Sequence, residues 1–127
     1  MLEQWHQVVK SRDINQLAAI LAENAVLHSP VIHRKVEGKA MVSMYLTAAL
    51  HTFANEQFTY DREFLADNSA VLEFSTEIDG IHVNGIDMIT WDETGKIIDF
   101  KVMVRPLKAI NLINDKMTAL LEKYKAG

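Results

Sequence analysis

The sequence contains no cysteine, only two prolines and no long run of apolar residues. The missing cysteines exclude disulfides, thiol nucleophiles and thiolate metal ligands. No apolar run approaches the roughly 20 residues that a membrane-spanning helix needs, and the N-terminal segment lacks the basic and apolar regions of a signal peptide. We therefore expect a cytoplasmic protein without a membrane partner.

Positive charge is also scarce, because 13 Lys and Arg residues stand against 17 Asp and Glu residues, for a formal net charge of −4. Nucleic-acid binding requires a concentrated excess of Lys and Arg, so no nucleic-acid partner is expected. The composition, with 49% hydrophobic and 24% charged residues, is typical of a globular protein. The length of 127 residues predicts one domain that covers residues 1–127.

Apolar residues at helical spacing predict three helices in the first half of the chain. The first is short and amphipathic and covers about residues 2–9. Asp13 can cap the second helix, which we expect to end near residues 23–24. The third runs from Gly38 to about Thr52.

The second half of the chain changes to the alternating pattern of β-strands. A short extended segment, residues 25–29, precedes the third helix, and an exposed loop covers residues 30–37. Four longer strands are predicted at residues 58–64, 70–78, 81–91 and 96–104, and a last helix after Pro106. This order predicts an α+β fold. We expect a cone-shaped, curved antiparallel sheet of about four long strands plus a short one, covered by the three N-terminal helices, with a C-terminal helix.

Three groups of motifs lie in an order and spacing that resemble a known superfamily. They are residues 12–17 with 22–26, Ser29-Pro30 with Gly38-Lys39 and Tyr45-Leu46, and residues 85–87 with 91–97. Together they resemble the nuclear transport factor 2-like superfamily, specifically its SnoaL-like and ketosteroid-isomerase-like branch, over nearly the whole chain. The resemblance implies a cystatin-like roll around one pocket and a homodimer formed through the outer face of the sheet. The superfamily contains both enzymes and non-catalytic modules, so it implies a pocket more strongly than a reaction.

The resemblance to ketosteroid isomerase can be compared at three positions. The general base of that enzyme is an Asp that precedes a Pro, and here Ser29 precedes Pro30. Its oxyanion hole uses a Tyr of the first helix, where this chain has Trp5, and a late-strand Asp, which corresponds to Asp87. A serine hydroxyl cannot remove a carbon-bound proton near neutral pH without a base of its own. We therefore do not expect steroid isomerisation.

Asp87 is the main catalytic candidate, because it lies inside an otherwise apolar predicted strand. A carboxylate on an apolar face is costly unless it is paired, hydrogen-bonded or protonated. Its pKa is therefore expected to be raised, which suits a general acid or a hydrogen-bond donor to a ligand. The alternative is a structural Asp held by Trp5 or by a neighbouring hydroxyl.

Further residues are candidates for the wall of the pocket, each with packing as the alternative. Tyr45 carries a phenol on the apolar side of the third helix, and aromatic or methionine side chains can form an apolar lining. Met103 has a second interpretation, as part of the outer sheet face. The predicted ligand-binding residues are Trp5, Ser29, Tyr45, Trp91 and Met103, and His28 and Arg105 are possible additions.

The five histidines show no spacing typical of metal ligands, so we expect neither a metal site nor another cofactor. Three functional hypotheses remain from the residues. The first is a pocket protein that binds a small hydrophobic molecule. The second is an acid–base enzyme of the isomerase, cyclase, dehydratase or hydrolase type that uses Asp87. The third is a non-catalytic, dimeric interaction module.

Overall fold

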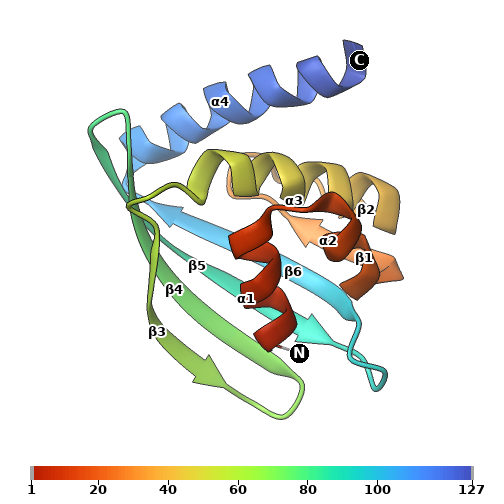
Figure 1. Cartoon of the computed structure of the whole chain (residues 1–127). Helices are drawn as coiled ribbons and strands as arrows, with labels where there is room; N and C mark the ends of the chain where they lie inside the picture. The colour runs from red at the N-terminus through yellow and green to blue at the C-terminus, as the bar shows by residue number, and fades with distance from the viewer. Residues whose placement is uncertain (1, 127) are drawn as a thin grey trace.

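The computed structural model describes residues 2–126 of the chain, which form one curved sheet and four helices (Figure 1). The helices are α1 (Leu2–Ser11), α2 (Ile14–Ile20), α3 (Lys39–Phe53) and α4 (Leu107–Ala126). The strands are β1 (Leu21–His28), β2 (Val36–Glu37), β3 (Thr59–Leu65), β4 (Ser69–Ile78), β5 (Ile81–Trp91) and β6 (Ile97–Arg105). They are arranged in the order β2-β1-β6-β5-β4-β3. The α+β fold is confirmed.

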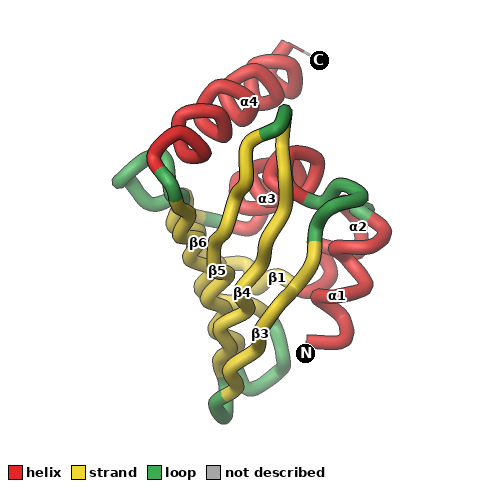
Figure 2. The backbone as a smooth tube through the Cα atoms, turned by 90° about the vertical axis from the view of Figure 1, so that its left-hand side faces the viewer, coloured by secondary structure: helices red, strands yellow, loops and turns green. Residues whose placement is uncertain are grey.

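The helices cover the concave side of the sheet in two layers (Figure 1). Figure 2 shows how the long strands bend around this side, so that the sheet and α3 enclose the interior. The helix α4 packs on α3 through Ala109, Ile113 and Met117, which belong to the same buried cluster as Ala48 and Phe53. The interior is therefore closed at one end by α4. None of the described helices combines the length and the apolar character that crossing a membrane requires.

The structure differs from the predicted sheet in three details. β1 runs parallel to β6, with Leu27 beside Phe100, so the sheet is mixed rather than antiparallel. β2 lies within the predicted loop and pairs with β1. The helix α2 ends at Ile20, because Leu21 already has extended backbone angles and begins β1. Strand pairing depends on tertiary contacts, and a one-dimensional apolar pattern does not contain them.

The meander β4–β5–β6 follows the alternating pattern closely. In β4 every second residue from Ala70 to Ile78 faces the core. The β4–β5 turn contains Asp79 and Gly80, both with positive φ (50° and 78°), as in the tight turns that match the twist of a hairpin. This turn sets the register that places Leu72 beside Asp87. On the other side, Val102 of β6 lies beside Asp87.

Gly85 allows an aromatic ring to lie across the middle of β5. A Cβ atom at this position would lie 2.5 Å from the carbonyl oxygen of Met103 and 2.6 Å from Cζ of Phe74. A side chain here would therefore displace either a backbone group or the Phe74 ring. Because Gly85 precedes Asp87 by two residues on the same face, it helps to form an aromatic surface next to the carboxyl group.

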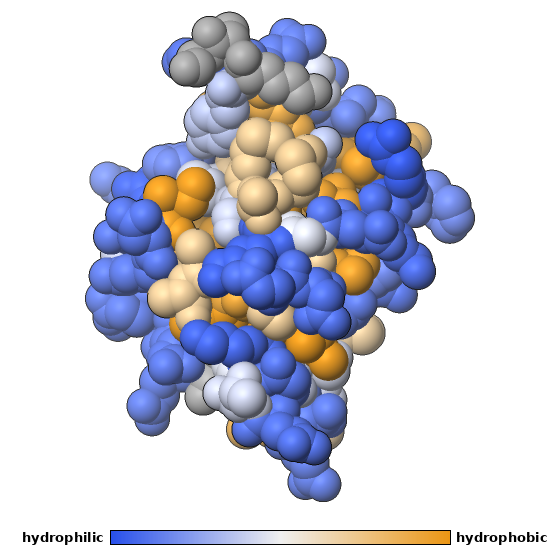
Figure 3. Space-filling model, turned by 90° about the vertical axis from the view of Figure 1, so that its right-hand side faces the viewer, coloured by the Kyte–Doolittle hydropathy of each residue, from blue (hydrophilic) through white to orange (hydrophobic). Residues whose placement is uncertain are grey.

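The outer surface of the helical side is mainly polar. On the face drawn in Figure 3, hydrophilic side chains surround a smaller group of apolar ones below the C-terminal end of α4. Several large apolar side chains are exposed elsewhere, among them Leu107 at 72% and Met103 at 51%. Met103 lies on the outer face of the sheet, whereas its neighbour Val102 is buried.

Candidate functional site

Asp87 lies in the centre of β5 with only 7% of its surface exposed. Its Oδ2 atom accepts a hydrogen bond of 2.6 Å from the hydroxyl of Tyr60 on β3. The indole Nε1 of Trp5, on α1, donates in turn to the Tyr60 oxygen at 2.9 Å. A directed chain of two hydrogen bonds therefore joins α1, β3 and β5 and ends at the carboxyl group.

Burial controls the protonation of this chain. Desolvation raises the pKa of Asp87 from 3.8 to about 7, and the hydrogen bond from Tyr60 opposes part of that rise. The pKa of Tyr60 is raised well above 10.0, first by burial and then by the negative charge of Asp87. Tyr60 therefore keeps its proton and remains a donor, while Asp87 changes its protonation state near neutral pH.

The second oxygen of Asp87 has no hydrogen-bond donor among the residues that the structure describes. Oδ1 is also absent from the fully enclosed polar atoms without a partner, which are the hydroxyl oxygens of Ser43 and Thr47. Oδ1 consequently has access to the cavity that Asp87 lines. It is the atom of the buried carboxyl group that can meet a ligand.

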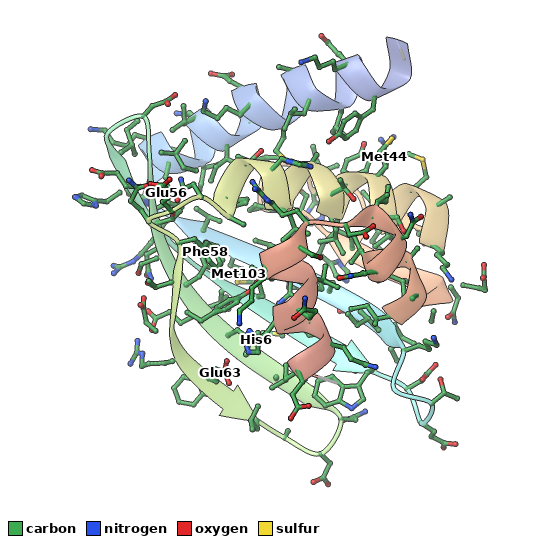
Figure 4. All side chains as sticks on the ribbon, in the orientation of Figure 1. His6, Met44, Glu56, Phe58, Glu63 and Met103 are labelled. Atoms are coloured by element: carbon green, nitrogen blue, oxygen red, sulfur yellow. The ribbon has the colours of Figure 1, made fainter. Side chains whose placement is uncertain are left out.

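The cavity beside Asp87 is small and almost entirely apolar. Its volume is about 30 Å³, which is room for roughly one or two water molecules. Partly exposed side chains, Ala54 and Phe58, lie toward its rim below the end of α3, where Figure 4 shows Phe58. The full lining consists of Trp5, Leu46, Ala49, Leu50, Phe53, Ala54, Phe58, Tyr60, Phe74, Asp87, Phe100 and Val102.

Aromatic contacts hold the Asp87 end of this cavity. Phe74 packs edge-on against Phe53 with ring centroids 5.4 Å apart and is stacked on Phe58 at the same distance. Phe58 contacts Tyr60 edge-on at 5.0 Å. Trp5 lies against Phe100 at 4.9 Å. Since each ring contacts at least one other, the wall around the carboxyl group is well ordered.

A second contact closes α1 onto β3 outside the cavity. His6 and Glu63 approach each other at 2.8 Å between Nε2 and Oε1, and Figure 4 shows both in the space between α1 and β3. The His6 ring also contacts Tyr60 edge-on at 5.3 Å. This pair lies on the solvent side of Tyr60 and helps to position α1.

The structure brings three of the predicted pocket residues to the interior. Trp5 lines the Asp87 cavity itself. Ser29 and Tyr45 line a neighbouring cavity, also of about 30 Å³, which lies between α3, α4, β6 and the start of the loop after β1. Ser29 is therefore separate from Asp87, although both are in the interior of the fold.

Trp91 and Met103 do not line the cavity at Asp87. The β5–β6 register shifts between Thr90 and Trp91, and Trp91 packs at the edge of the core beside a surface hollow at the Asp92–Thr94 turn. Met103 points to the opposite face of the sheet, because side chains alternate along β6 and Val102 takes the inner position. The expected wall of Trp and Met side chains is formed mainly by phenylalanines instead.

His28 and Arg105 lie outside the interior as well. His28 Nε2 is 2.9 Å from Oδ1 of Asp99, and His28 lines a surface groove of about 430 Å³ with Ser29 and Met103. Arg105 donates from Nε to Oδ1 of Asn84 at 2.9 Å. It partners an amide on the outer sheet face, not the carboxyl group of Asp87.

Tyr60 is the site residue that the sequence analysis missed. The strand that contains it was predicted, and its spacing from Phe58 puts both on one face. However, β3 has an irregularity between Tyr60 and Arg62, and the rest of the strand is mostly exposed. A phenol two residues after a phenylalanine, at the start of an edge strand, was the available signal. Among the described residues, no three His, Asp or Glu side chains converge as metal ligands would.

Comparisons with known proteins identify the family. The family model described as a SnoaL-like domain matches residues 2–100. The chain therefore belongs to the SnoaL-like family, within the nuclear transport factor 2-like fold. No curated protein matches the chain.

Solved structures agree with this assignment. A structure described as a steroid delta-isomerase from Pseudomonas aeruginosa is 38% identical with a TM-score of 0.92, over 99% of this chain and 92% of that one. An uncharacterised protein with a cystatin-like fold from Silicibacter pomeroyi DSS-3 is 30% identical with a TM-score of 0.86, over 93% and 82%. A protein of unknown function from Mesorhizobium loti, 18% identical with a TM-score of 0.70 over 83% and 88%, shares the fold.

Proposed function

We propose that this protein binds a small, largely apolar molecule in the cavity beside Asp87, and that Oδ1 of Asp87 holds one polar group of that molecule. The observation that carries the proposal is a buried carboxyl oxygen without a protein partner at an otherwise apolar cavity. A buried polar atom without a partner costs free energy, and a ligand that supplies the missing hydrogen bond recovers it.

The environment of Asp87 supports a neutral ligand with one hydrogen-bonding group. Protonated Asp87 can donate from Oδ1 to a carbonyl oxygen, whereas the ionised form can accept from a hydroxyl. Burial already makes the charge of Asp87 unfavourable, so an anionic ligand would add a second buried negative charge. Because the cavity holds only about 30 Å³, a ligand has to displace side chains at the rim near Phe58.

Acid–base catalysis by Asp87 is the second candidate. Two observations favour it: the pKa of about 7, which suits proton transfer near neutral pH, and the description of the 38% identical structure as a steroid delta-isomerase. Against it, Asp87 is the only carboxyl group among the lining residues of the two interior cavities. Ser29 stands where the isomerase base is expected and lines the other cavity. Binding without chemistry is therefore the stronger proposal.

Cyclohexanone is a suitable neutral probe for the binding proposal. We expect its titration, followed by protein NMR shifts below pH 7, to move signals of residues around Phe58 and Asp87. Asp87→Leu removes the donor and should weaken binding by about tenfold, because a hydrogen bond to a buried polar group contributes about 1.4 kcal/mol here. Asp115→Leu, on the exposed side of α4, is the control. Equal affinities of the wild type and Asp87→Leu would remove Asp87 from the binding role.

The same probe separates binding from catalysis when it is dissolved in deuterium oxide. A base that removes a proton next to the carbonyl group causes deuterium to enter the ring at that position. The binding proposal expects no acceleration of this exchange by the protein. Exchange that is accelerated by the wild type and not by Asp87→Leu would instead establish the second candidate.

We also propose a homodimer formed through the outer face of the sheet. Val71 pairs with Met88, and Ile86 pairs with Met103, so four apolar residues lie side by side on that face. Beside them Arg62 donates to Glu73, and both Arg62 and Asn84 lower the pKa of Glu73 through hydrogen bonds. An apolar patch next to polar groups suits a self-complementary interface.

Met103→Glu should dissociate this dimer, because the interface would then bury two additional carboxylates. Sedimentation velocity of the wild type and the variant measures the change from dimer to monomer. Leu107→Glu is the matched control, since Leu107 is exposed at 72% at the start of α4. A wild type that sediments as a monomer at high concentration would contradict the proposal.

A cytoplasmic location and a single domain over residues 1–127 also remain proposals. The first is supported by the lack of cysteine, and the second by the length of the chain. The SnoaL-like match itself covers residues 2–100, and α4 lies beyond it.

A further inference from the structure

The two interior cavities share one wall. Leu46, Ala49 and Phe53 of α3 and Val102 of β6 line both of them. The cavities are thus two ends of one space between α3 and β6, separated by these side chains. Each end has a volume of about 30 Å³, which is too small by itself for an organic molecule of more than a few atoms.

The two ends differ in chemistry. The first contains the carboxyl group of Asp87 and the hydroxyl of Tyr60. The second has no ionisable carboxyl or amino group, and its polar side chains are Ser29 and Tyr45. Ile113 and Met117 of α4 cover the second end. A molecule that occupies both ends would place its polar group at Asp87 and an apolar part beneath α4.

The two ends also differ in how easily they can change shape. Paired aromatic rings hold the Asp87 end. At the other end Met117 has an unbranched, flexible side chain that readily adopts other rotamers, and its sulfur accepts only a long contact of 3.6 Å from Thr52. In the shared wall, Ala49 is a single methyl group. Expansion is therefore easiest from Ala49 toward Met117.

We propose that the ligand is elongated, with one neutral hydrogen-bonding head group at Asp87 and an unbranched apolar tail that passes between Ala49 and Val102 into the cavity beneath Met117. This inference rests on the proposed binding function and adds the shape of the ligand class. It also assigns the choice of tail length to Ala49, Val102 and Met117, none of which touches the head group.

A series of methyl ketones tests the tail. Methyl ethyl, methyl hexyl and methyl decyl ketone have the same head group and increasing tails. For the wild type we expect the affinity to rise by about fourfold per methylene until the second cavity is filled, as for buried CH₂ groups in general. The ε-methyl NMR signal of Met117 should shift with the longer ketones and not with methyl ethyl ketone.

Ala49→Phe should fill the passage between the cavities. It is expected to bind methyl ethyl ketone like the wild type and to lose the gain in affinity from a longer tail. Ala49→Val is a milder version that keeps the test valid if the larger side chain prevents folding. Ala119→Phe, at an exposed position of α4, is the matched control and should keep the full dependence on tail length.

The results separate this inference from the binding function on which it rests. If methyl ethyl ketone binds but longer tails bring no gain and leave Met117 unchanged, the elongated ligand is overturned and the binding function stands. An equal loss of affinity for every ketone in Ala49→Phe would also overturn the passage at Ala49. If no ketone of any length binds to the wild type, both proposals fail.

Discussion

Asp87→Asn should remove a loss of stability that the wild type undergoes between about pH 4 and pH 7. The pKa of Asp87 is about 7 in the folded protein, against 3.8 for a free carboxyl group. Between these values the folded state holds a proton that the unfolded state has released, so the free energy of unfolding falls as the pH rises. Above pH 7 both states are ionised and this contribution stays constant.

The size of the effect follows from the difference between the two pKa values. About three pH units at about 1.4 kcal/mol each give a loss of roughly 4 kcal/mol. Asparagine has a similar shape but cannot ionise, so the variant should gain that amount relative to the wild type between pH 4 and pH 8. Urea unfolding at a series of pH values measures the difference.

Asp115→Asn is the control for this experiment. Asp115 is exposed on α4, so water solvates its charge in both the folded and the unfolded state. The control should therefore follow the wild type. If Asp87→Asn also ran parallel to the wild type over the whole range, Asp87 would be solvated rather than buried.

Trp5→Ala should destabilise the protein by about 4 kcal/mol, the usual size for the loss of a fully buried tryptophan. Trp5 is 2% exposed, packs against Phe100 and donates to Tyr60. Its removal takes away both the ring contact and the first donor of the chain that ends at Asp87. The measurement is the free energy of unfolding from urea titrations.

The second tryptophan serves as the control for the first. Trp91 is partly exposed and packs at the edge of the core, so Trp91→Ala should cost clearly less. Trp5→Phe keeps an aromatic ring without the indole donor and should fall between the two. A ranking in which Trp91→Ala is the most damaging would contradict the position of Trp5 at the centre of the site.

The sequence allowed Asp87 to be predicted because a carboxyl group within an apolar run has few explanations. It also predicted the helices and the four long strands, since their patterns are local. Met103 was harder, because a shift of one residue moves a strand side chain to the opposite face. Trp91 follows an irregularity in the pairing of β5 with β6, and strand alternation alone does not predict such a shift.

Tyr60 and the parallel pairing of β1 with β6 could not be derived in the same way. The hydrogen bond from Tyr60 to Asp87 joins residues 27 positions apart on strands that are not neighbours in the sheet. It depends on the curvature that brings β3 over β5. The sequence analysis instead considered Tyr45, which lies on the apolar side of α3 as expected but lines the second cavity.

The most direct test of the central claim is the titration of the Asp87 carboxyl carbon by NMR, without a ligand and with methyl hexyl ketone. We predict a midpoint near pH 7 for the free protein. The ketone should raise the midpoint, because its carbonyl oxygen binds the protonated form of Asp87. A midpoint near 4 that the ketone leaves unchanged would contradict both the buried carboxyl group and its role in binding.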